Sequence, residues 1–158
     1  MDQQDIRPED TVIVVSTSGR NPVPIDVALM AQEKGAFVIG ITSFAYAKSQ
    51  PSKHWSGKTL HQTVDLAIDN HVPPVDTLLN LPLNDNPVSF GPASTVLGAA
   101  VLNGIFAETI GILAKKGLTP PVFQSGNLEG ASEHNQRLIQ RYKGRIPFFN
   151  ERSSKDIT

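Results

Sequence analysis

The chain has 158 residues, 39% of them hydrophobic, which is enough for one folded domain with its own core. It has no cysteine, and this excludes disulfide scaffolds, thiol nucleophiles and cysteine metal sites. A total of 14 Lys and Arg against 15 Asp and Glu gives a net charge of -1, so nucleic acid is not an expected partner. The acidic start of the chain does not match a secretory signal, and we expect a cytoplasmic protein.

Two short runs of β-branched and apolar residues predict buried strands at 11–16 and 37–42. Between them, residues 22–34 have the spacing of a helix, and Gly35 stands where its C-cap is expected. Four apolar residues define one face of that helix: Val23, Val27, Met30 and Ala31. Because both strands are apolar throughout rather than alternating, they indicate a parallel sheet covered by helices on both faces.

Weaker patterns follow these elements. They predict a short helix over residues 56–64 and a third strand over 65–69. Residues 71–92 are rich in Pro and Asn, which favours a loop with at most an edge strand at the apolar island 78–83.

The clearest helix is predicted over residues 94–116, with Ser94 or Thr95 as its cap. Its apolar stretch approaches the length of a membrane span but contains Asn103 and Glu108. A span would place a carboxylate in hydrocarbon, so we predict a buried core helix and no membrane partner. The stretch is apolar almost all the way round and must be covered on every side, so we also expect the protein to associate through it.

The C-terminal part of the chain predicts one more helix. Residues 132–142 form it, with Ser132 as the cap, and residues 150–158 form a polar tail. The folded domain is therefore expected to span residues 1–149.

The most informative segment is STSGRN, residues 16–21, which we call the cradle. It lies at the carboxyl end of the first predicted strand, the edge at which parallel sheets bind ligands. Its hydroxyl groups, its glycine and the free N–H groups of the following helix could bind a phosphate dianion. An ordinary capped turn uses the same residue types, and the local pattern does not choose between the two.

STSGRN resembles the Ser-x-Ser-Gly-x-Thr/Asn signature of sugar isomerase (SIS) domains. The segments HWSGKTL, SFGPASTVLGAAVLN and PPVFQSGNLEGASEHNQRLIQRYKGRI are similar to a phosphoheptose-isomerase-like branch of that family. The resemblance implies a three-layer α/β sandwich that binds a sugar phosphate as a homo-oligomer, a dimer or a tetramer. It further implies an aldose–ketose isomerase, with a non-catalytic phosphosugar sensor or a sugar-ether lyase as alternatives.

The resemblance also assigns residues to roles. It places the phosphate on Ser16, Ser18 and Asn21 and on the backbone of Thr17 and Gly19. The catalytic candidates are His134, which could move protons near neutral pH, and more weakly Glu133. The weaker candidates for sugar contacts are Ser94, Thr95, His54 and Lys58. Each of these also has an ordinary structural interpretation, as a helix cap, a loop residue or a surface histidine.

Two further expectations concern what the chain lacks. Its histidines do not have the paired spacing of a metal site and no nucleotide-binding glycine pattern is present, so no metal and no cofactor are expected. Only ten polar residues precede the first strand, whereas SIS domains resembling this one begin with further helices and a strand. We therefore expect that part of the fold to be missing and phosphosugar binding to survive better than turnover.

Overall fold

The computed structural model describes residues 4–83 and 86–149, so the predicted polar tail at 150–158 lies outside the described residues. The chain divides into two compact units. The first is Ile6–Phe106, and the second combines Met1–Asp5 with Ala107–Thr158.

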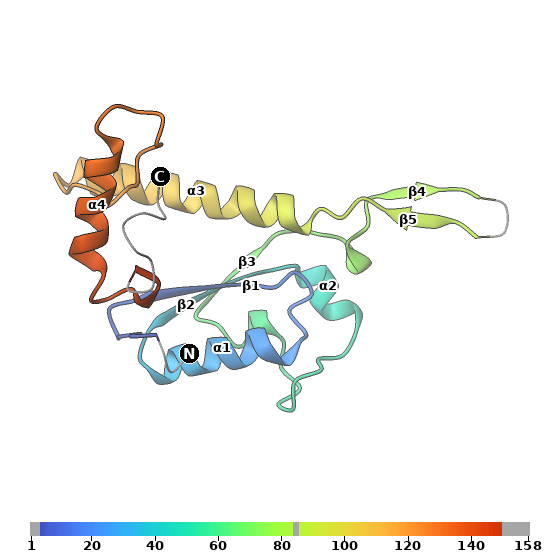
Figure 1. The fold of residues 1–158 in the computed structure, drawn as a ribbon. Coiled ribbons are helices and arrows are strands. Elements are labelled where there is room, and N and C mark those ends of the chain that lie inside the picture. The colour runs from blue at the N-terminus through green and yellow to red at the C-terminus, as the bar shows by residue number, and fades with distance from the viewer. Residues whose placement is uncertain (1–3, 84–85, 150–158) are drawn as a thin grey trace. The chain divides into compact units, whose positions relative to one another are not determined.

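The first unit is built on a parallel sheet of three strands in the order β1-β2-β3 (Figure 1). The strands are β1 (Thr11–Val15), β2 (Phe37–Thr42) and β3 (Leu66–Asp69). Helix α1 (Pro22–Glu33) connects β1 to β2 and contacts both strands. The predicted α/β class, with a parallel sheet packed against helices, is confirmed.

The face of α1 that packs on the sheet differs from the predicted one. Its buried residues are Ile25, Ala28 and Ala31, whereas Val23 is 70% exposed. The helix carries apolar residues on several sides, so periodicity alone does not select the packed face. The two alanines allow the helix to lie close to β2, whose Val38 and Ile41 are completely buried.

The predicted helix over 56–64 is wrong in position and length. Helix α2 (Phe44–Ser49) follows β2 directly, and its cap Ser43 accepts a hydrogen bond from the Tyr46 N–H at 3.1 Å. Only one 3-10 turn, Leu60–Gln62, forms inside the predicted range. A left-handed glycine, Gly57 with φ +73°, prevents a continuous helix there.

Residues 71–92 contain more regular structure than the predicted loop with a single edge strand. Strands β4 (Leu79–Leu81) and β5 (Val88–Phe90) form an antiparallel hairpin that is separate from the parallel sheet. Leu79 pairs with Phe90 and Leu81 with Val88, so these four apolar side chains share one face. Each of them is about half exposed.

Helix α3 (Ser94–Lys115) has the predicted extent, but it is not the predicted buried core helix. Gly98 is its only residue described as buried, and only 6% of its most apolar window is covered. Among the described residues, α3 is also the one helix that is long and apolar enough to cross a bilayer. The helix is apolar on every side, but its one buried residue, Gly98, faces the Val15 side chain on one side only.

The cap of α3 comes from a residue distant in sequence. Ser94 is the first helical residue, and the Asp76 carboxylate accepts hydrogen bonds from the N–H groups of Ala93 and Ser94 at 2.9 and 3.0 Å. Asp76 and its neighbour Val75 have positive φ angles of 57° and 73°. The turn therefore holds two non-glycine residues in an unfavourable conformation while it directs the carboxylate to the helix.

The second unit contains helix α4 (Ala131–Tyr142) and a 3-10 turn, Pro147–Phe149. Helix α4 begins one residue before the predicted start. Its N-cap is Gly130, with φ +76°, rather than Ser132. An ion pair joins Arg145 to Asp5 at 3.1 Å.

The Asp76 cap should make the stability of the first unit dependent on pH. Burial alone would raise the pKa of Asp76, but hydrogen bonds from Ser94 and Ala93 lower it below the ordinary 3.8. A lowered pKa means that the stabilisation is complete above pH 3.8 and disappears as the pH falls through the folded-state value.

We expect Asp76→Asn, which keeps an acceptor oxygen but no charge, to lower the free energy of unfolding near neutral pH by about 0.3–1 kcal/mol. Urea titrations at neutral and acid pH measure this difference, with Glu33→Gln as a control at an exposed site. A difference that persists unchanged below pH 3.8 would contradict the assigned cap.

Candidate functional site

The cradle connects the carboxyl end of β1 to the first turn of α1. Three backbone hydrogen bonds fix its path, and their acceptors and donors lie on β2 and on the segments that follow it. They join Ser16 N to Ile41 O at 3.0 Å, Ser43 N to Thr17 O at 2.9 Å and Leu60 N to Gly19 O at 2.8 Å. The cradle is therefore held by segments distant in sequence and is not a free loop.

The hydroxyl and amide side chains of the cradle have no protein partner among the described residues. No hydrogen bond there involves the hydroxyl groups of Ser16, Thr17 or Ser18, which are partly exposed. Asn21 occupies the N-cap position of α1 with extended backbone angles, but its side chain makes no capping hydrogen bond. The side-chain hydrogen bond of a capped turn is therefore absent at Asn21, and these polar groups remain available to a ligand.

Gly19 is required where it stands. Its φ is +59°, and a Cβ atom placed on it would lie 2.6 Å from Thr42 Oγ1. The Thr42 hydroxyl, completely buried, donates to the Thr17 carbonyl at 3.2 Å. Any side chain at position 19 would displace the end of β2 or the cradle itself.

Arg20 braces the cradle against the loop of residues 50–59. Its Nε donates to the Pro51 carbonyl at 2.8 Å, and its Nη1 donates to the Gln50 side chain. In return, the Lys53 N–H donates to the Arg20 carbonyl at 2.9 Å. The Arg20 guanidinium thus joins the cradle to the loop of residues 50–59.

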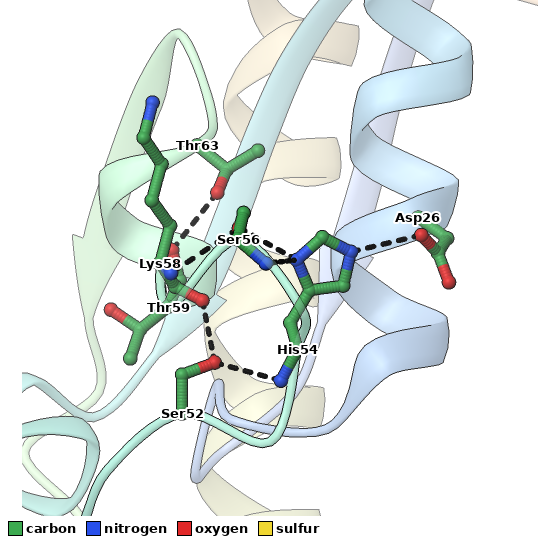
Figure 2. Close-up of polar contacts among 7 residues, drawn as sticks. All are labelled: Asp26, Ser52, His54, Ser56, Lys58, Thr59 and Thr63. Carbon is green, nitrogen blue, oxygen red and sulfur yellow. Dashed lines mark hydrogen bonds and ion pairs between the residues drawn. The ribbon is translucent and has the colours of Figure 1, made fainter.

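His54 lies inside that loop, and its side chain is completely buried (Figure 2). Its Nε2 is 3.0 Å from Asp26 Oδ1 and its Nδ1 is 2.7 Å from Ser56 Oγ. A carboxylate accepts hydrogen bonds and the Ser56 N–H donates to Nδ1, so we assign the proton to Nε2. Both nitrogens are occupied by protein groups, and the predicted sugar contact of His54 stays a prediction, as does that of the exposed Lys58.

Sequence reasoning missed two titratable groups near the carboxyl edge of the sheet. Burial alone would raise the pKa of Asp69, but N–H groups of His71 and Phe44 and nearby positive charges lower it. Burial and the charge of Lys48 lower the pKa of His61, whose Nδ1 is 2.9 Å from Thr59 Oγ1. The position of Asp69 at the end of a predicted strand was the available signal.

The other predicted residues lie elsewhere. Ser94 interacts with Asp76 at the start of α3, and Thr95 is exposed on the same turn. His134 and Glu133 belong to the first turn of α4 in the second unit. His134 Nε2 is 2.9 Å from the Val122 carbonyl, which can only accept, so the lone pair of the neutral ring resides on Nδ1.

No group of three or more His, Cys, Asp or Glu residues that could hold a metal ion occurs in the described part of the chain. The predicted absence of a metal and of a cofactor stays a prediction.

Comparison with known proteins supports the resemblance found in the sequence. Residues 1–43, which include the whole cradle, match the SIS domain family. The chain is 56% identical over 96% of its length to a UPF0309 protein of Geobacillus kaustophilus, of which it covers 59%. It is 54% identical over 93% of its length to UPF0309 proteins of Halalkalibacterium halodurans and Listeria monocytogenes, of which it covers 58% and 59%. The chain spans about three-fifths of the length of these curated relatives, and the predicted SIS resemblance is confirmed.

The close approach at Gly19 gives a direct test of the cradle. We expect Gly19→Ala to lower the free energy of unfolding by more than the roughly 1–2 kcal/mol that a left-handed residue costs, because Thr42 Oγ1 is in the way. Gly57→Ala is the matched control, since Gly57 has φ +73° but no atom lies within 4 Å of the point where its Cβ would stand.

In a double-mutant cycle, Gly19→Ala should cost less in a Thr42→Ala background than in the wild type. Chemical denaturation measures the wild type, both single variants, the double variant and Gly57→Ala. Equal losses for Gly19→Ala and Gly57→Ala would contradict the steric explanation.

Proposed function

We propose that this protein binds a phosphosugar and that the cradle holds its phosphate. The observation that carries the proposal is a set of polar groups without a protein partner in the described part of the chain, on Ser16, Ser18 and Asn21 before α1. They flank Gly19, whose backbone lies against the Thr42 side chain, in the turn that leads into the positive end of α1. Each hydrogen bond to a charged oxygen contributes about 1.5–3 kcal/mol, so a few of them would dominate the binding of a small sugar phosphate.

The proposed reaction is aldose–ketose isomerisation of that sugar phosphate. The reaction moves a proton between C1 and C2 of the open-chain sugar and needs a group that exchanges protons near neutral pH. His134 supports this role because its tautomer leaves Nδ1 as the basic atom, with Glu133 as the second candidate. Proton transfer of this kind requires no redox cofactor and no metal, and the proposed location is the cytoplasm.

The proposed assembly is a homo-oligomer in which a second copy covers α3. Its exposed apolar side chains include Val96 at 70%, Phe106 at 52% and Ile112 at 43% exposure. Burial of these side chains against an identical helix removes apolar surface from water, and the glycines of α3 permit close approach.

Binding is tested by Ser18→Ala. The change removes one hydroxyl from the cradle, and we expect it to weaken binding of a hexose 6-phosphate by about tenfold or more. Isothermal titration calorimetry measures the dissociation constant, with Ser49→Ala as a control outside the cradle. An unchanged constant for Ser18→Ala would remove Ser18 from the phosphate site.

Catalysis is tested by two substitutions of His134. His134→Gln retains a donor for the Val122 carbonyl but no basic nitrogen, whereas His134→Ala loses both. We expect both variants to bind the hexose phosphate and to lose its interconversion, followed by a coupled assay. Turnover that survives in both variants would remove His134 from the proposed reaction.

Association is tested by light scattering at micromolar concentration. We expect a dimer or tetramer, which Val96→Lys and Phe106→Lys should dissociate, while Leu128→Lys outside α3 should not. A wild-type monomer, or co-sedimentation of the protein with lipid vesicles, would contradict a second copy as the cover of α3.

A further inference from the structure

Trp55 is the only tryptophan of the chain and the most exposed large apolar side chain among the described residues, at 87%. An indole ring offers a wide, flat and electron-rich surface with few rotatable bonds, which suits it to contacts with ligands. Two charged residues flank it in the loop, Lys53 and Lys58, and both are exposed. The loop thus carries a flat apolar ring with a lysine before it and a lysine after it in the sequence.

The loop that carries Trp55 is cross-linked within itself, as Figure 2 shows for its polar contacts. Ser52 Oγ accepts from the His54 N–H at 3.0 Å and donates to the Lys58 carbonyl at 2.7 Å. The N–H of Gly57 donates to the His54 carbonyl at 2.9 Å, which closes a tight turn around Trp55. The backbone of this exposed residue is therefore fixed on both sides.

The ring of Trp55 is also supported. Its centroid lies 5.2 Å from that of the His54 ring, with an interplanar angle of 41°. His54 is in turn fixed by Asp26 of α1 and by Ser56. The buried His54 ring, bonded at both nitrogens, thus lies beside the exposed indole. His54 acts as a positioning residue for Trp55.

Both ends of this loop are attached to the cradle. The Lys53 N–H bonds the Arg20 carbonyl and the Leu60 N–H bonds the Gly19 carbonyl, at 2.9 and 2.8 Å. Trp55 follows Lys53 by two residues, which extend over at most about 7 Å of chain. Trp55 therefore lies close along the chain to the point where this loop is bonded to the cradle.

We propose that Trp55 is the stacking platform for the sugar ring of the phosphosugar, next to the cradle that binds its phosphate. This inference rests on the proposed function and adds a specificity element to it. The C–H groups on one face of a pyranose ring form an apolar, partially positive surface, which complements the electron-rich face of indole. Lys53 and Lys58 contribute donors to the hydroxyl groups at the rim of the ring.

The experiment separates ring recognition from phosphate recognition. The three probes are inorganic phosphate, glycerol 3-phosphate, which has no ring, and a hexose 6-phosphate, each titrated calorimetrically. Because the chain has one tryptophan, its fluorescence reports on Trp55 alone in the same titrations. We expect hexose 6-phosphate to change the intensity and emission maximum more than either ring-free probe.

We expect Trp55→Ala to weaken hexose 6-phosphate binding by about tenfold and to leave both ring-free probes unchanged. Trp55→Phe should restore most of the affinity, and Phe90→Ala is the control at another exposed aromatic side chain. Circular dichroism and the thermal midpoint verify that each variant is folded.

Two results would overturn the inference in different ways. If Trp55→Ala binds hexose 6-phosphate as the wild type does while Ser18→Ala weakens the binding of all three probes, the phosphate site at the cradle is supported and the role of Trp55 is wrong. If the wild-type protein binds none of the probes, the proposed function is wrong and the platform with it.

Discussion

The contact between the cradle backbone at Gly19 and the Thr42 hydroxyl is the constraint on which the site depends. The chain must pass from the end of β1 into α1 while it lies directly against the end of β2. Only glycine fits here, because a Cβ atom would stand 2.6 Å from Thr42 Oγ1 and because φ is +59°. In the same passage, the Ser16 and Ser18 side chains make no hydrogen bond to a protein group in the described part of the chain.

Hydrogen bonds from the loop of residues 50–59, which follows α2, hold the cradle in place. The loop is attached to the cradle through backbone bonds at Arg20 and Gly19, and to α1 through the hydrogen bond from His54 to Asp26. A ligand that binds the cradle therefore meets groups whose positions are already fixed. Little ordering is left for the ligand to induce, which favours affinity for a small molecule. The exposed side chains of the loop, including that of Trp55, extend from a backbone that these hydrogen bonds hold in place.

Local sequence patterns correctly predicted the elements that depend on residues close together in the sequence. The strands at residues 11–16 and 37–42, the extent of α3 and the position of the cradle follow from β-branched runs, helix periodicity and turn residues. The packed face of α1 was predicted incorrectly, because a helix with apolar residues on several sides has no unique face in sequence. The prediction that α3 is buried was wrong for a similar reason. An apolar helix must be covered, but its sequence does not show which segment or which molecule covers it.

The contacts that build the site could not be predicted in this way. The hydrogen bond between His54 and Asp26 joins residues 28 positions apart, and the bond from the Ser94 N–H to the Asp76 carboxylate joins residues 18 apart. No periodicity encodes such pairs, because they result from the path of the whole chain. The hairpin β4–β5 was missed because each strand has only three residues, too few for an alternating pattern to be distinguished from a loop.

The central claim is that the cradle binds phosphate, and amide chemical shifts measure it at each residue. In a titration of the isotope-labelled protein with inorganic phosphate, the account predicts saturable shifts concentrated at the N–H groups of residues 17–21 and of Val23. Amides of α4 should remain unshifted. Saturable shifts that avoid the cradle, or no saturable shifts at all, would contradict the account.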